Sequence, residues 1–280
     1  MRKIEASRIT EAVRILYSDI NYILPPDIEA AFGASLSKEN NKTARNTLKV
    51  LIENARIARK ELIPICQDTG LAVVFMEIGQ DVHITGGDIR RSVDQGIRDA
   101  VKGAYLRCSV VKSPVERINT KDNAPAILHT SIVPGNKIRI TVAAKGAGSE
   151  NMSALKMLKP ADGIEGIKEF VLETVRNAGP NPCPPIVVGV GIGGNFETSA
   201  LLAKKALMRD IRKRNPDKNV SKLEKELLDQ INRLGIGPSG FGGKTTAFAV
   251  NIETLPCHIA SLPVAVNIEC HAHRHASFVI

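Results

Sequence analysis

At 280 residues the chain is long enough to bury a substantial core, and its 43% hydrophobic and 24% charged residues are ordinary for a soluble globular protein. Glu5 and Glu11 interrupt the opening segment, so we expect neither a secretory signal nor, elsewhere, a membrane partner. A reducing cytoplasm then accounts for five cysteines kept as thiols. The net charge of +9 permits nucleic acid, but aromatics are only 4%, so attraction of a small anionic substrate or of an acidic partner subunit is favoured.

Helical spacing of apolar residues dominates the first 62 residues. It predicts a helix over 7–24, which Pro25-Pro26 ends. A second helix is expected from Asp27, and a long third one from Ser37 to about Glu61. We therefore expect residues 1–62 to form a helical N-terminal segment, followed by a core over residues 63–280.

Strand and helix patterns mix from Gly70 onward. The predicted strands cover 71–79, 81–87, 126–133, 137–144, 186–194, 246–252 and 262–268. The predicted helices cover 88–106, which Asp88 is expected to cap, 163–177, 196–207 and 222–234. No repeat or linker marks a boundary. The sequence thus predicts a single domain over 1–280 of the α+β class, with mixed β-sheets flanked by helices.

Two glycine-rich segments partly match nucleotide-binding motifs. The GxGxxG spacing at 189–194 follows a predicted strand, but no second strand ends in an acidic residue about 20 residues later, as a Rossmann unit requires. A tight strand-to-helix turn is therefore favoured, with nicotinamide binding as the alternative. The segment 242–245 matches the end of a phosphate-binding loop, but Pro238 stands where that loop needs its first glycine. ATP binding is not expected.

Three cysteines carry the strongest chemical signal. Cys66, Cys183 and Cys270 lie far apart, and none belongs to a CxxC pair. Three thiolates brought together by the fold would leave one iron of a cubane cluster without a protein ligand, and such an iron is a Lewis acid. A zinc site made by Cys257, His258 and the tail 270–275 is an alternative. Adjacent residues of an extended segment face opposite ways, which argues against it.

Two further segments have an ordinary and a functional interpretation. Asp68 could form a turn before Gly70, or it could move a proton on a substrate bound next to Cys66. The segment 145–151 could be a simple loop, or its backbone N–H groups could receive a carboxylate.

Seven segments in this order resemble the α subunit of class I fumarate hydratase, the oxygen-sensitive iron–sulfur type, and also the α subunit of L-tartrate dehydratase. They are CQDTG (66–70), LRCS (106–109), AAKGAGSEN (143–151), NPCPP (181–185), VGVGIGG (188–194), FGGK (241–244) and PCHIASLPVAVNIECHAHRH (256–275). The resemblance implies a hydro-lyase that reversibly hydrates fumarate to (S)-malate, a step of the tricarboxylic acid cycle. Dehydration of L-tartrate to oxaloacetate is the alternative that it leaves open.

The resemblance also implies roles, position by position. The cluster ligands would be Cys66, Cys183 and Cys270, which hold a [4Fe-4S] cluster with one iron not ligated by cysteine. The substrate-binding residues would be Gln67, Arg107 and Gly148, and the catalytic residues would be Asp68 and His258. Cys108 and Cys257 match no ligand position.

The resemblance also predicts a partner subunit, because this chain matches only the part of the single-chain relatives that ends just after the last cluster cysteine. The single-chain relatives continue beyond the last cluster cysteine with a portion that resembles a separate β subunit. That subunit would supply a catalytic threonine and further basic anchors, so a hetero-tetramer acting on a small dicarboxylate such as fumarate or malate is expected. A different class of function stays open, namely a metal- or cluster-binding regulatory protein whose basic surface meets nucleic acid.

Overall fold

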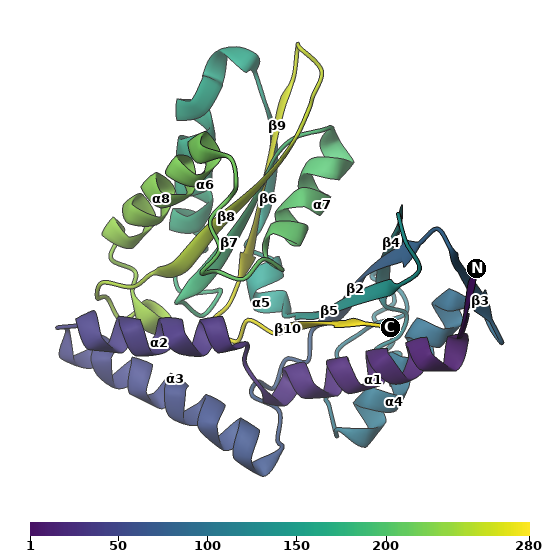
Figure 1. Cartoon of the computed structure of the whole chain (residues 1–280). Coiled ribbons are helices and arrows are strands. Elements are labelled where there is room, and N and C mark those ends of the chain that lie inside the picture. The colour runs from purple at the N-terminus through teal and green to yellow at the C-terminus, as the bar shows by residue number, and fades with distance from the viewer. The chain divides into compact units, whose positions relative to one another are not determined.

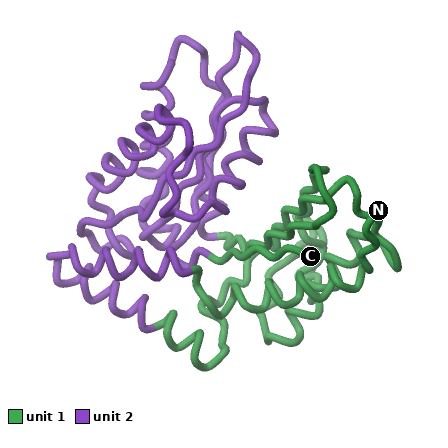
Figure 2. Tube along the Cα trace, in the orientation of Figure 1, with its two compact units in different colours: residues 1–25, 54–147, 274–280 green, residues 26–53, 148–273 purple.

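The computed structural model describes all 280 residues, which divide into two compact units (Figure 1). Unit 1 comprises residues 1–25, 54–147 and 274–280, and unit 2 comprises residues 26–53 and 148–273 (Figure 2). Neither unit is contiguous in sequence, because the chain passes from one to the other after residues 25, 53, 147 and 273. None of the helices has both the length and the apolar character needed to cross a membrane. A single domain over 1–280 stays a prediction.

Unit 1 is built on a mixed sheet with the strand order β10-β5-β2-β4. Its strands are β2 (Leu71–Gly79), β4 (Ile127–Val133), β5 (Ile138–Lys145) and β10 (His275–Val279). The β2 strand pairs in parallel with β4 and antiparallel with β5, whose other side pairs antiparallel with β10. A separate parallel pair joins β1 (Arg2–Glu5) to β3 (Val82–Thr85).

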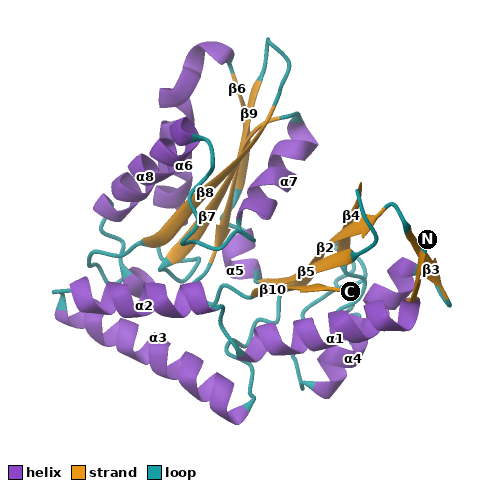
Figure 3. Ribbon diagram, in the orientation of Figure 1, coloured by secondary structure: helices purple, strands orange, loops and turns teal.

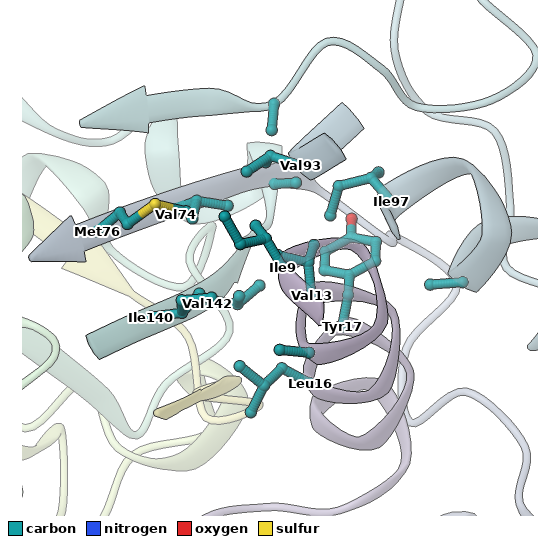
Figure 4. Close-up of a cluster of buried hydrophobic side chains, with 14 of the residues drawn as sticks. Ile9, Val13, Leu16, Tyr17, Val74, Met76, Val93, Ile97, Ile140 and Val142 are labelled. Carbon is teal, nitrogen blue, oxygen red and sulfur yellow. The ribbon is translucent and has the colours of Figure 1, made fainter. Parts of the chain in front are cut away.

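Two helices of unit 1, α1 (Ala6–Tyr22) and α4 (Ile89–Gly103), build its core together with the sheet (Figure 4). The apolar stripe of α1 packs with the inward-facing positions of β2 and β5, where alternation places every second side chain in the core. The labelled residues of α1, α4, β2 and β5 are Ile9, Val13, Leu16, Tyr17, Val93, Ile97, Val74, Met76, Ile140 and Val142. Asp88 caps α4 as predicted, since its carboxylate accepts the Arg91 amide at 2.8 Å.

Unit 2 contains a second mixed sheet, with the order β6-β9-β7-β8. Its strands are β6 (Ala154–Leu158), β7 (Ile186–Gly193), β8 (Ala247–Leu255) and β9 (Leu262–Glu269). The helices α6 (Gly163–Ala178) and α8 (Lys218–Arg233) cover one face, and α7 (Phe196–Ala206) covers the other (Figure 3). The unit also contains α2 (Pro26–Lys38), and the division between the units falls within α3 (Lys42–Glu61) and the short α5 (Ala147–Glu150).

The glycines of β7 allow α7 to pack directly on the strand. A Cβ atom at Gly189 would overlap the carbonyl oxygen of Ala203, and one at Gly191 would overlap that of Ser199. The turn that follows needs left-handed backbone at Gly193 and Gly194, with φ values of 89° and 67°. These glycines therefore serve packing and the strand-to-helix turn, which was the favoured interpretation of the GxGxxG spacing.

The α+β class predicted from the sequence is confirmed, but three strands and two helix starts were not predicted correctly. The strands β1, β6 and β10 were missed. The helix expected from Ser37 begins at Lys42, because the Glu39 carboxylate accepts the amides of Asn40 and Asn41 between α2 and α3. The α8 helix begins at Lys218 rather than Lys222, because Asp217 caps it.

Candidate active site

The loop between α3 and β2, in unit 1, holds Cys66, Gln67 and Asp68. The Asp68 amide donates to the Cys66 sulfur at 3.4 Å, and that sulfur lies 3.4 Å from Oε1 of Gln67. The Asp68 carboxylate accepts two backbone amides, from Gly70 at 2.9 Å to Oδ1 and from Ala147 at 2.8 Å to Oδ2. Both oxygens are engaged, so the half-buried carboxylate has a fixed direction.

Gly70 explains why this loop returns to the sheet where it does. Its φ is 74°, and a Cβ atom there would overlap the carbonyl oxygen of Lys145 at the end of β5. This close approach brings Asp68 next to Gly146 and Ala147. The turn interpretation of the segment is thus confirmed, and the turn itself fixes the carboxylate.

Arg107 follows α4 in a stretch of unit 1 that Asn123 holds in place. The buried Asn123 side chain accepts the amides of Ser109 and Val110 at 2.6 and 3.2 Å, and it donates to the Arg107 carbonyl at 2.9 Å. The guanidinium of Arg107 is exposed and forms no hydrogen bond or ion pair. Its donors are therefore available to a ligand.

Unit 2 brings the segments of Cys183 and Cys270 together. Cys183 has left-handed backbone, with a φ of 53°, in the loop between α6 and β7, and Cys270 directly follows β9. The Cys183 carbonyl accepts the His271 amide at 3.3 Å, and Nδ1 of His271 lies 2.9 Å from the same oxygen. Since a carbonyl only accepts, the proton of this contact is on Nδ1.

Gly148 belongs to the same cluster of segments in unit 2. A Cβ atom there would lie 3.5 Å from the Asn181 carbonyl oxygen, two residues before Cys183. The hydroxyl of the next residue, Ser149, lies 3.3 Å from Oε1 of the buried Glu269, which also accepts the Cys270 amide at 3.1 Å. Unit 2 thus collects Gly148, Cys183 and Cys270 at the carboxyl end of β9.

His258 lies at the other end of the same strand. It sits in the exposed loop between β8 and β9, where Nδ1 accepts the Ala260 amide at 3.1 Å. The eight residues of β9 separate it from Cys270, which corresponds to about 26 Å of extended chain. Unit 2 alone therefore does not bring His258 to the two cysteines. The alternative zinc site, which joins Cys257 and His258 to the tail 270–275, fails for the same reason.

The phosphate-loop interpretation of FGGK is also excluded by a contact within unit 2. The Lys244 amide donates to Oε2 of the buried Glu39 at 2.7 Å, and a Cβ atom at Gly243 would lie 2.6 Å from that oxygen. A carboxylate thus occupies the position that a phosphate would need. FGGK (241–244) is therefore a turn that packs against the segment between α2 and α3.

The cysteine side chains suit an iron–sulfur cluster. All five cysteines are free thiols, with Cys183 exposed and Cys66 and Cys270 partly exposed. The backbone of each of these three is fixed by the contacts described above, and the Asp68 amide donates to the Cys66 sulfur. Cys66 belongs to unit 1, whereas Cys183 and Cys270 belong to unit 2.

Arg274 is the residue that the sequence patterns missed. It is 2% exposed, and its Nη2 and Asp68 Oδ2 both lie near Gly146. Its place in the HAHRH run of the resemblance was the only signal.

Known proteins are similar to this chain over nearly its whole length, including the segments of the candidate site. The sequence profile of the fumarate hydratase (Fumerase) family matches residues 10–279. A protein of Methanocaldococcus jannaschii with the provisional name L(+)-tartrate dehydratase subunit alpha is 47% identical over 275 residues, which cover 96% of each chain. The L(+)-tartrate dehydratase subunit alpha of Escherichia coli K12 is 30% identical over 278 residues, or 98% of this chain and 91% of that protein. The protein of that name from Shigella sonnei is equally similar.

Proposed function

This chain belongs to the fumarate hydratase (Fumerase) family, and from that membership we propose that it is the α subunit of a two-subunit [4Fe-4S] hydro-lyase. The substrate is a four-carbon dicarboxylate. Fumarate, hydrated to (S)-malate, is the first candidate because of the family. L-Tartrate is the second, because the relatives bear that name. The observation that supports the proposal best is the contact between the Cys183 and Cys270 segments next to Gly148.

Cys66, Cys183 and Cys270 would hold the cluster. When bound, a cluster with one iron free of cysteine supplies a Lewis acid that makes the substrate's hydroxyl a better leaving group. The chain's own residues bind the substrate and move the proton.

Asp68 would transfer the proton at the carbon next to a carboxylate. Amide hydrogen bonds to both of its oxygens hold the carboxylate in one orientation, which is what a placed base needs. Arg107 would pair with a substrate carboxylate as a two-pronged donor, and its unpartnered guanidinium supports this. Gln67 and the Gly148 amide would orient the substrate. The surplus of basic residues suits a dianion.

His258 needs another chain in this proposal. Because β9 separates it from Cys270, it would contribute only to a site that a second copy or the β subunit completes. Its catalytic role stays a prediction. The β subunit itself would supply a threonine and further basic anchors, in a hetero-tetramer.

An anaerobic assay of the reconstituted α–β complex tests the proposal. The complex should turn over fumarate and malate or, under the second candidate, L-tartrate, while the α chain alone should be nearly inactive. Full activity of the α chain alone would contradict the need for a partner. A complex with full iron and sulfide that turned over none of the three substrates would favour the regulatory alternative.

A further inference from the structure

Arg274 is a buried cation without an ion-pair partner. The residue is 2% exposed, Nη1 donates to Oδ1 of Asn21 at 2.9 Å, and Nε has no partner. Its backbone is fixed at the start of β10, because its carbonyl accepts the Ala144 amide at 3.0 Å. An uncompensated buried charge costs several kcal/mol, so a group that interacts with Arg274 is expected nearby.

Gly146 shows where that group lies. A Cβ atom at Gly146 would be 3.3 Å from Oδ2 of Asp68 and 3.6 Å from Nη2 of Arg274, and the next nearest atom is Cγ of Asp68 at 3.9 Å. No direct ion pair joins the two side chains. The φ of Gly146 is not left-handed, so the backbone does not require glycine here. Glycine at this position leaves the space between an acceptor and a donor free of a side chain, and we call this space the Gly146 notch.

Hydrogen bonds around the notch connect Arg274 to the loop that contains Cys66. Asn21, which accepts from Arg274, also accepts the Ile65 amide through its backbone carbonyl at 2.9 Å, one residue before Cys66. Tyr17 lies on α1, like Asn21, and its hydroxyl is buried and has no hydrogen-bond partner. Burial raises the pKa of Tyr17, while the charge of Arg274 lowers it and that of Asp68 raises it. Both charges therefore act on one spot in unit 1.

We propose that Arg274 is a positioning residue, which holds the Asp68 carboxylate through one water molecule in the Gly146 notch. The water accepts from Nη2 of Arg274 and donates to Oδ2 of Asp68, an oxygen that already accepts the Ala147 amide. Water and amide together fix the plane of the carboxylate. The kinetic consequence of this inference rests on the proposed function, but the water itself does not.

A high-resolution crystal structure of the α–β complex tests the water directly. We expect an ordered oxygen within hydrogen-bond distance of both Asp68 Oδ2 and Arg274 Nη2, and we expect Gly146→Ala to remove it. A wild-type structure with no oxygen at that position, in a site of otherwise well-ordered atoms, overturns the proposal. This outcome is independent of any activity.

Kinetics of the same complex test the positioning. Gly146→Ala and Arg274→Lys should lower kcat by about 10- to 100-fold, the scale expected for a misplaced catalytic group, with KM and the iron and sulfide content unchanged. Guanidinium ion should restore part of the kcat of Arg274→Ala, which a loss of folding would not allow. Gly103→Ala and Arg91→Lys are matched controls, because a Cβ atom at Gly103 meets nothing within 4 Å and Arg91 is exposed.

The two proposals fail differently. If the wild-type complex has no hydro-lyase activity, the proposed function fails and the crystallographic test still decides on the water. If the wild type is active and both variants keep its kcat, the positioning role of Arg274 is wrong.

Discussion

The carbonyl oxygen of Cys183 lies 2.9 Å from Nδ1 of His271, the residue that directly follows Cys270. The His271 amide approaches the same oxygen at 3.3 Å. One carbonyl group thus holds together two segments that are 87 residues apart at their cysteines, from 183 to 270. His271 thus fixes the spacing of these two segments.

The first prediction concerns this contact. His271→Ala removes the ring hydrogen bond, at a cost of about 1 kcal/mol, and frees the Cys183 loop to move. We expect the anaerobically reconstituted complex to lose iron and sulfide faster during desalting than the wild type. His83→Ala, at the exposed position of β3, is the control. Equal retention in all three proteins would show that the contact does not matter for the cluster.

Cysteine replacements test the ligand assignment. Cys66→Ser, Cys183→Ser and Cys270→Ser should each abolish or cripple cluster loading, because a serine hydroxyl is a poor iron ligand in place of a thiolate. Cys257→Ser should load normally, since Cys257 lies at the other end of β9. Iron and sulfide analysis with the visible absorption spectrum measures this. Full loading and activity of Cys183→Ser would show that the assignment is wrong.

Arg107→Lys tests whether the guanidinium of Arg107 binds a substrate carboxylate. Lysine keeps the charge but loses the two-pronged geometry, so KM for the dicarboxylate should rise by about 10-fold, with a smaller change in kcat. The exposed pair of Arg98 with Asp122 gives the control Arg98→Lys, which should leave both constants unchanged. An unchanged KM in Arg107→Lys would remove this residue from the substrate site.

Tyr17 gives a pH-dependent prediction for stability. Its pKa is raised in the folded protein, so the folded state holds the phenol proton at pH values where the unfolded chain releases it. The stabilisation is complete below the unfolded pKa of about 10 and is lost as the pH rises above that value. Tyr17→Phe should lose less stability between pH 9 and about 11 in urea titrations. At pH 7 it should be unchanged or more stable by about 1 kcal/mol, because it removes a buried hydroxyl that has no partner. A parallel decline of both proteins would contradict this account.

Gly191 tests the packing of α7 on β7. Its Cβ atom would overlap backbone of the helix, so Gly191→Ala should destabilise unit 2 by about 3 kcal/mol or more. Gly103→Ala, in open space at the end of α4, should be neutral or slightly stabilising. Thermal melting of both variants measures the difference. A wild-type melting temperature for Gly191→Ala would mean that the strand and helix can separate at no cost.

The structural features predicted best from the sequence are those that depend on residues close together in the chain. The cap at Asp88 and the strand 71–79 follow from local pattern, and both are present as predicted. The strands β6 and β10 were missed, because five-residue strands such as these carry too little alternation to stand out. The break between α2 and α3 was predicted before Ser37 and lies instead at residues 39–41, because Glu39 is fixed by an amide at Lys244, 205 residues away.

The prediction of site residues from the sequence was limited in the same way. The cysteines and Asp68 were candidates because they stand in short, distinctive segments. Arg274 could not be found in this way, since its importance comes from burial next to Gly146 and Asn21, which only the fold reveals. Likewise, His258 and Cys270 lie apart because the residues between them form the extended strand β9 and not a turn.

The strand β10 has a consequence for synthesis of the chain on the ribosome. It is an edge strand of the unit 1 sheet, and it emerges only after every residue of unit 2 has been made. Until then the nascent chain lacks Arg274, the cation buried beside Asp68, and the hydrogen bonds between Ile138 and Ile280. The sheet of unit 1 is therefore completed late, because β5 is synthesised long before its partner strand β10.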